Sequence, residues 1–156
     1  MEAFVVSPSE GQLVEGMGIK IRILVTGAQT GGLFSTIEMT APPGFRAPPA
    51  LHRHVDIDWH ARVLSGTVVM NLDGREVTIP AGGFVFVPRG AAFKWWNGSA
   101  TEPVSWTCTY APSGFEQYFV EIAAAVNSLG RAPVPGDLAV IAPPLWKKHG
   151  VEVVPG

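Results

Sequence analysis

Two histidines separated by a single residue, His52 and His54, are the residues whose type and spacing best suit chemistry. Side chains at positions i and i+2 of a β-strand lie on one face, so both imidazoles are aimed at the same volume. A histidine titrates near neutral pH, and the pair can therefore act as general acid and base without a metal. We predict that His52 and His54 are catalytic residues, with the alternative that they only form hydrogen bonds in the structure.

Two polar residues that follow the pair, Asp58 and His60, suggest a second kind of site. Imidazole and carboxylate groups are ligands of transition metals, so a metal site of His52, His54, Asp58 and His60 is an open alternative. Side chains alternate along a strand, however, and the apolar residues around Trp59 share the face opposite to Asp58 and His60. If the apolar face is interior, a metal site needs a slipped register or a bulge.

Large aromatic side chains surround the histidines in the sequence. Trp59, Phe93 and Trp95 predict either an aromatic slot for a small flat substrate or plain core packing. Glu38 is a charged residue in an otherwise apolar strand, and an inward Glu38 would be a further acid or base. We therefore take Trp59, Phe93, Trp95 and Glu38 as the candidate substrate-binding residues.

Composition excludes several classes of protein. The hydrophobic fraction of 47% and the charged fraction of 15% exclude a disordered chain. The net charge is −2 and the cationic residues are scattered, so we expect no nucleic-acid partner. Cys108 is the only cysteine, so no intrachain disulfide forms. The start lacks the features of a signal peptide and no apolar stretch approaches roughly 20 residues, so we expect a cytoplasmic protein without a membrane partner.

The elements that must position these residues are short strands followed by helices. Turn-forming residues bound the apolar runs. Strands are predicted over residues 18–26, 33–40, 57–64, 66–72, 75–79, 84–87, 92–97, 104–110 and 151–154. Asp73-Gly74 predicts a hairpin turn, and Pro48-Pro49 predicts a stiff approach to the next strand.

Helical spacing begins after the last long strand. It predicts one helix over 113–129 and a second from 135–137 to 148, and Ser113 with Glu116 predicts a capping box for the first. Strands followed by helices favour an all-β jelly-roll barrel with one or two C-terminal helices. We predict a single domain over residues 1–156, with a barrel core at about 18–110 and a helical appendage at about 113–148.

Two sets of residues at fixed spacing carry a family resemblance. They are His52-Arg53-His54 with Gly66, and Gly82 with Pro88, Gly90 and Asn97. The first set has the spacing of a motif that reads His-x-His, four residues, Glu, six residues and Gly. The second has the spacing of a motif that reads Gly, five residues, Pro-x-Gly, two residues, His, three residues and Asn. Both sets match except at the Glu and the third His. Residues 18 to 128 thereby resemble the cupin superfamily, in particular small single-domain cupins similar to quercetin dioxygenases.

The resemblance implies a jelly-roll barrel with a degenerate metal site. Metal-binding cupins hold a transition metal with two His, a Glu and a third His. In this chain Trp59 stands at the Glu position and Phe93 at the position of the third His. Neither ring offers a lone pair to a metal, so no cofactor is expected, with a divalent transition metal as the alternative.

Three hypotheses for function follow. The first is a metal-independent isomerase, cyclase, dehydratase or decarboxylase acting on an apolar or aromatic metabolite, as in secondary metabolism, with His52 and His54 transferring protons. The second is a metal-dependent dioxygenase using His52, His54 and either Asp58 or His60. The third is a cupin that binds a small molecule without catalysis. A homodimer is also expected, because aromatic and charged residues are predicted on the outer surface or in a subunit interface. They are Trp96, Lys94, Arg62 and His60.

Overall fold

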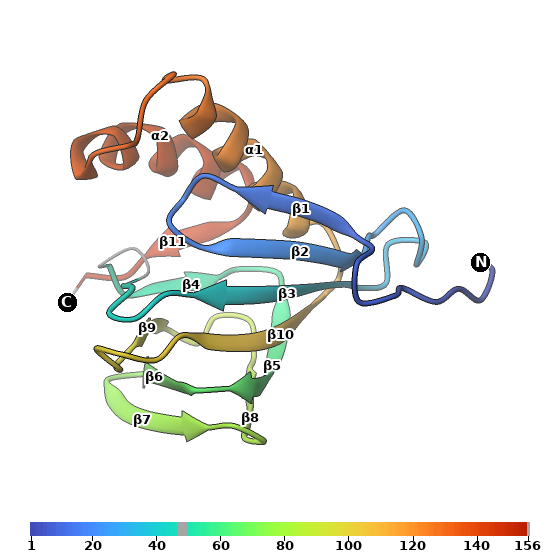
Figure 1. Cartoon of the computed structure of the whole chain (residues 1–156), viewed down its shortest axis with the longest axis horizontal. Helices are drawn as coiled ribbons and strands as arrows, with labels where there is room; N and C mark the ends of the chain where they lie inside the picture. Colours follow the sequence, from blue (N-terminus) through green and yellow to red (C-terminus); the bar gives the residue numbers. More distant parts are fainter. Residues whose placement is uncertain (47–49, 156) are drawn as a thin grey trace.

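The computed structural model describes residues 1–46 and 50–155, and in this part of the chain two antiparallel sheets face each other (Figure 1). The first sheet has six strands in the order β1-β2-β3-β10-β5-β8. They are β1 (Gln12–Glu15), β2 (Lys20–Val25), β3 (Ser35–Ala41), β5 (Asp58–Ser65), β8 (Phe84–Val87) and β10 (Val104–Ala111).

The second sheet has five strands in the order β11-β4-β9-β6-β7. They are β4 (His52–His54), β6 (Thr67–Leu72), β7 (Arg75–Pro80), β9 (Phe93–Asn97) and β11 (Val151–Val153). The expected jelly-roll barrel is therefore confirmed, and the chain crosses between the sheets as it runs from β3 to β4 and from β4 to β5.

The core lies between the sheets because apolar residues alternate with polar ones along each strand. On β5, Trp59, Ala61 and Val63 are buried, whereas His60 and Arg62 between them are exposed. The expected alternation is confirmed, and no register slip turns Trp59 outward. Between β6 and β7, Asp73 and Gly74 form the expected two-residue turn, with φ of 48° and 87°.

Helices α1 (Glu116–Asn127) and α2 (Pro135–Lys148) pack against each other beside β1 and β11 at one end of the barrel (Figure 1). Their bounds agree with the prediction, but the capping box of Ser113 and Glu116 was wrong. Phe115 is the N-cap, and no side chain caps the helix there. The Glu116 carboxylate instead accepts hydrogen bonds from the backbone N–H groups of Gly27 (2.8 Å) and Gly114 (2.7 Å).

Two strands lie outside the expected barrel core of 18–110. β1 precedes it and extends the first sheet through β2. β11 follows the helices and pairs with β4, the strand of the histidine pair. The strand predicted over 151–154 is therefore confirmed as an edge strand of the second sheet.

The stiff approach predicted for Pro48-Pro49 falls outside the described residues, so the structure does not test it. Among residues 1–46 and 50–155, no helix is long and apolar enough to span a membrane.

Candidate functional site

The histidine pair lies on β4, a strand of three residues held between two neighbours. β11 pairs with it on one side, with His54 opposite Val151 and His52 opposite Val153. On the other side, His52 is opposite Phe93 of β9. The His54 carbonyl also accepts a hydrogen bond from the N–H of Gly90 (2.8 Å). The backbone of the pair is therefore held by β11 near the C-terminus and by residues 90–93 in the middle of the chain.

His52 is partly buried and keeps one ring nitrogen for chemistry. Its Nδ1 lies 3.2 Å from the carbonyl oxygen of Ala50. Since a carbonyl only accepts, this contact assigns the proton to Nδ1 and leaves a lone pair on Nε2. Burial lowers the pKa of His52, and the Ala50 hydrogen bond raises it in partial compensation. His52 is thus a neutral imidazole with a free basic nitrogen near pH 7.

His54 lies deeper and is only 3% exposed. Burial, and then the charge of His52, lower its pKa to about 3. The Nδ1 atom is buried and has no hydrogen-bond partner among the described residues. His54 is consequently neutral across the physiological range, and its buried nitrogen is unsatisfied.

Aromatic rings enclose the two imidazoles. Ring centroids of His52 and His54 are 6.1 Å apart, and Phe93 contacts both, at 4.4 Å from His52 and 5.5 Å from His54. Phe115, just before α1, meets His54 edge-on at 4.3 Å. The predicted pairing of the histidines with Phe93 is therefore present, whereas Phe115 was not among the predicted site residues.

Trp59 and Trp95 extend this aromatic cluster across the core. Trp59 packs on Phe93 with ring centroids 4.9 Å apart, and its ring centroid lies 6.2 Å from that of Trp106 on β10. Trp95 packs on Trp106 at 4.8 Å. Trp106 and Tyr110 were missed as site residues, although the alternating run 104–110 was the signal that could have placed them beside buried Cys108.

The residues at the expected metal position do not fit a metal ion. Trp59 and Phe93 are in ring contact there. Asp58 is held away by Arg89, whose Nη2 lies 2.8 Å from Oδ2 and whose hydrogen bonds lower the Asp58 pKa to about 2. His60 packs on Phe84 on the outer face, with ring centroids 5.2 Å apart.

The four-residue alternative of His52, His54, Asp58 and His60 is therefore not assembled. Within residues 1–46 and 50–155, no group of three or more His, Cys, Asp or Glu side chains is placed to hold a metal ion. The sequence of the remaining gap, Ala47-Pro48-Pro49, offers no ligand side chain either.

Glu38 does not join the site, which corrects the expectation of an inward acid. It lies between Ile37 and Met39, which are buried, so its side chain is on the outer face of β3. There it accepts a hydrogen bond from Nη2 of Arg22 at 3.1 Å, and its side chain is 30% exposed. An ion pair with a cross-strand neighbour accounts for the charge in this strand.

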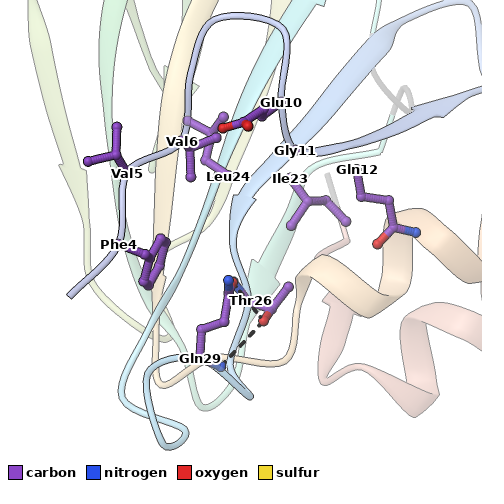
Figure 2. A pocket seen from close by; sticks show the side chains of 10 residues that line it. All are labelled: Phe4, Val5, Val6, Glu10, Gly11, Gln12, Ile23, Leu24, Thr26 and Gln29. Carbon is purple, nitrogen blue, oxygen red and sulfur yellow. Dashed lines mark hydrogen bonds between the residues drawn. The ribbon is translucent and has the colours of Figure 1, made fainter. Parts of the chain in front are cut away.

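A cavity of about 480 Å³ lies apart from the histidines (Figure 2). The N-terminal segment around Phe4 and Val6 forms one wall, and Ile23 and Leu24 of β2 form another. None of the predicted site residues lines this cavity, so it does not extend the site described above.

Fold and site together define a class of protein: a small barrel of two facing antiparallel sheets, with a histidine pair among aromatic rings inside it. A family model for the cupin domain matches residues 37–110, which include the histidines, Trp59 and Phe93. This match assigns residues 37–110 to the cupin superfamily.

Solved structures agree with this assignment. KdgF from Halomonas sp. superposes with a TM-score of 0.63 and 15% identity, over 74% of this chain and 99% of that chain. An RmlC-like cupin from Shewanella frigidimarina gives 0.61 and 18%, over 75% and 96%. Pac13 from Streptomyces, a nucleoside dehydratase, gives 0.57 and 19%, over 74% and 88%. At such identities the likeness establishes the fold alone. No curated protein matched the chain significantly.

Proposed function

We propose that this cupin is a metal-independent enzyme in which His52 acts as general base on a small apolar or aromatic metabolite. The observation that carries the proposal is the hydrogen bond between His52 Nδ1 and the Ala50 carbonyl. It fixes the tautomer, so that Nε2 presents its lone pair from a partly buried ring with a lowered pKa. A neutral imidazole of this kind can accept a proton at neutral pH.

The reaction class follows from what such a base can do. His52 Nε2 takes a proton from a carbon next to a carbonyl group, and the C–H electrons move onto the carbonyl oxygen to give an enolate. The His52 imidazolium then gives this proton, or one exchanged with solvent, back to carbon. Alternatively it protonates a hydroxyl on the next carbon, which leaves as water while the enolate re-forms the carbonyl group. Isomerisation and dehydration share this first step, and the description of Pac13 as a nucleoside dehydratase is compatible with it.

Proton exchange provides a test that needs no knowledge of the natural substrate. Protein with EDTA in D₂O is incubated with a panel of small aromatic ketones, and NMR follows exchange of the protons next to the carbonyl. We expect exchange that EDTA does not slow and that His52→Gln reduces by about 10²-fold or more. His60→Gln is the matched control, because His60 lies on the outer face against Phe84. Full activity in His52→Gln, or activity lost to EDTA and regained with metal, would contradict the proposal.

One observation favours a second candidate, a cupin that binds a small molecule without catalysis. His54 has a pKa of about 3, so at neutral pH it is the neutral imidazole, whose N–H can donate a hydrogen bond but is too weakly acidic to act as a general acid. A site with one base and no paired acid is less suited to reactions that need both. Binding of a probe at the aromatic cluster without any proton exchange would support this candidate instead.

We also infer self-association through the outer face of the first sheet. β8 is an edge strand, and its Phe84 and Phe86 are each 58% exposed. Arg62 and His60 on the adjacent β5 are exposed beside them, whereas Lys94 and Trp96 are partly buried on the other sheet. An edge strand with exposed aromatic side chains offers both backbone and apolar contacts to a second copy.

A further inference from the structure

Several buried polar atoms in the described core have no hydrogen-bond partner. Three of them belong to rings of the aromatic cluster: Nε1 of Trp59, Nε1 of Trp106 and Nδ1 of His54. These side chains are 3%, 1% and 3% exposed. A buried donor without a partner destabilises the fold, and folded proteins pair nearly all such groups. Three unpaired nitrogens in one cluster therefore point to a partner that is not part of the chain.

The two indoles can serve one ligand atom group. Their ring centroids are 6.2 Å apart and their planes are nearly perpendicular, at 80°. They come from neighbouring strands, β5 and β10, and the pair of residues between them in the sheet, Ala61 and Cys108, is small. Side chains this short allow the two indole rings to approach each other across the sheet.

The chemistry of these nitrogens selects the ligand. An indole N–H only donates, so it needs an acceptor such as a carbonyl or hydroxyl oxygen. Neutral His54 can accept or donate through Nδ1. The neighbouring side chains Phe93 and Tyr110 are aromatic. The carboxylate of buried Glu116 is already hydrogen-bonded to the backbone N–H groups of Gly27 and Gly114. An ionised ligand would lose its hydration without an opposite charge, which disfavours it.

We propose that Trp59, Trp106 and His54 bind a small, flat, uncharged molecule through its acceptor oxygen, with the indole N–H groups as donors. This assignment rests on the proposed function, because it names the substrate class of the same site. It adds Trp106 as a specificity-determining residue. Partly buried Phe45 and Trp95 form a chain of ring contacts that ends on Trp106.

A matched pair of probes tests the assignment. Acetophenone carries a carbonyl oxygen, whereas ethylbenzene has the same ring and chain length without an acceptor. In ¹H–¹⁵N spectra we expect acetophenone to shift the indole N–H signals of Trp59 and Trp106, and ethylbenzene to bind roughly tenfold more weakly. Trp106→Phe and Trp59→Phe should each weaken acetophenone binding by about tenfold, the loss of one hydrogen bond. Trp96→Phe is the control, since Trp96 lies against Arg46 outside the cluster.

Each outcome bears on the assignment separately from catalysis. Shifts of both indole signals with no proton exchange would support the ligand class and contradict the proposed function. Equal binding of both probes, or no shift of the indole signals up to the solubility limit of acetophenone, would overturn the ligand class. Proton exchange on other ketones would still test the proposed function independently. A long-lived water in contact with both indole protons, undisturbed by acetophenone, would also overturn it. These readouts use the wild-type protein, so they stand even if a tryptophan variant fails to fold.

Discussion

The imidazole of His54 and the phenyl ring of Phe93 lie face to face, 5.5 Å apart and 9° from parallel. Phe93 stands where the family motif has its third histidine, so a ring that binds metal in relatives is replaced by one that stacks on its former partner. An apolar ring on one face and the edge of Phe115 on another favour neutral imidazole over imidazolium. This relationship makes His54 a source of pH-dependent stability.

The free energy of unfolding should fall as the pH drops below about 6.5. The pKa of His54 is lowered from 6.5 to about 3 on folding, so between these values the unfolded chain binds more protons than the folded one. Stability then rises with pH, by up to ~1.4 kcal/mol per pH unit from this one group. The contribution is fully present above the unfolded pKa and is lost as the pH falls toward the folded one.

Urea denaturation on the acid side of neutrality measures this slope. His54→Leu should flatten it in the region above pH about 5, where carboxylates with an ordinary pKa near 4 stay ionised. His60→Gln is the matched control, because it removes an imidazole that is exposed on the outer face. Equal slopes in wild type and His54→Leu would mean that another group carries the dependence.

Strand alternation made part of this site predictable from the sequence. The period of two placed Trp59 inside and Asp58 and His60 outside, and each lies where the pattern put it. The motif spacing likewise brought Phe93 to the histidines. Such features depend on local geometry and on spacing along the chain, which the sequence displays directly.

Other features depend on contacts between distant segments and were not predictable in the same way. Phe115 covers His54 because α1 packs on that end of the barrel, and no local pattern reports this. Glu116 looked like half of a capping box, but its carboxylate serves the N–H of Gly27, far away in the sequence. Glu38 was ambiguous because a strand can carry an ion pair with a neighbour, Arg22, that only the sheet order reveals.

The C-terminal strand should control the environment of the histidines. β11 pairs with β4, and Glu152 at its centre lies opposite Arg53 between the two histidines. Glu152→Pro removes a backbone N–H there and should loosen β4. We expect the pKa of His54, followed by NMR, to rise from about 3 toward its ordinary value as the ring becomes hydrated.

Glu152→Gln serves as the matched control for this experiment. It removes only the ion pair with Arg53, which is partly exposed and contributes at most ~1 kcal/mol to stability. His54 should titrate in this variant as in wild type. An unchanged His54 titration in Glu152→Pro would show that β4 keeps its position without β11.

Phe86→Ser should weaken self-association. Phe86 is 58% exposed on the edge strand β8, and its loss removes an apolar contact without disturbing the core. Light scattering across a concentration series should report a dimer for wild type and a larger monomer fraction for the variant. Val140→Ser, at a site 74% exposed on α2, controls for loss of an exposed apolar group elsewhere. A wild-type monomer at all concentrations would refute the proposed interface.

Phe93→His should create a metal site of three histidines. The Phe93 ring lies 4.4 Å from that of His52 and 5.5 Å from that of His54, so a third imidazole there would converge with the pair. Three histidines with an open fourth position are a known arrangement for zinc. We expect close to one equivalent of Co²⁺ bound per chain, with the visible absorption of a tetrahedral site, and far less in wild type.

Lys94→His is the decisive control, because it adds the same imidazole one residue further along β9, on the opposite face of the sheet. It should bind no more Co²⁺ than wild type does. If Phe93→His also failed to bind although it folded, the histidine pair would be too rigidly held by Phe115 and β11 to turn toward a metal. The absence of metal binding would then result from the residues packed around the histidines as well as from Trp59 and Phe93 at the two ligand positions. Success would instead mean that His52 and His54 remain poised as ligands, and that Phe93 alone separates this barrel from metal binding.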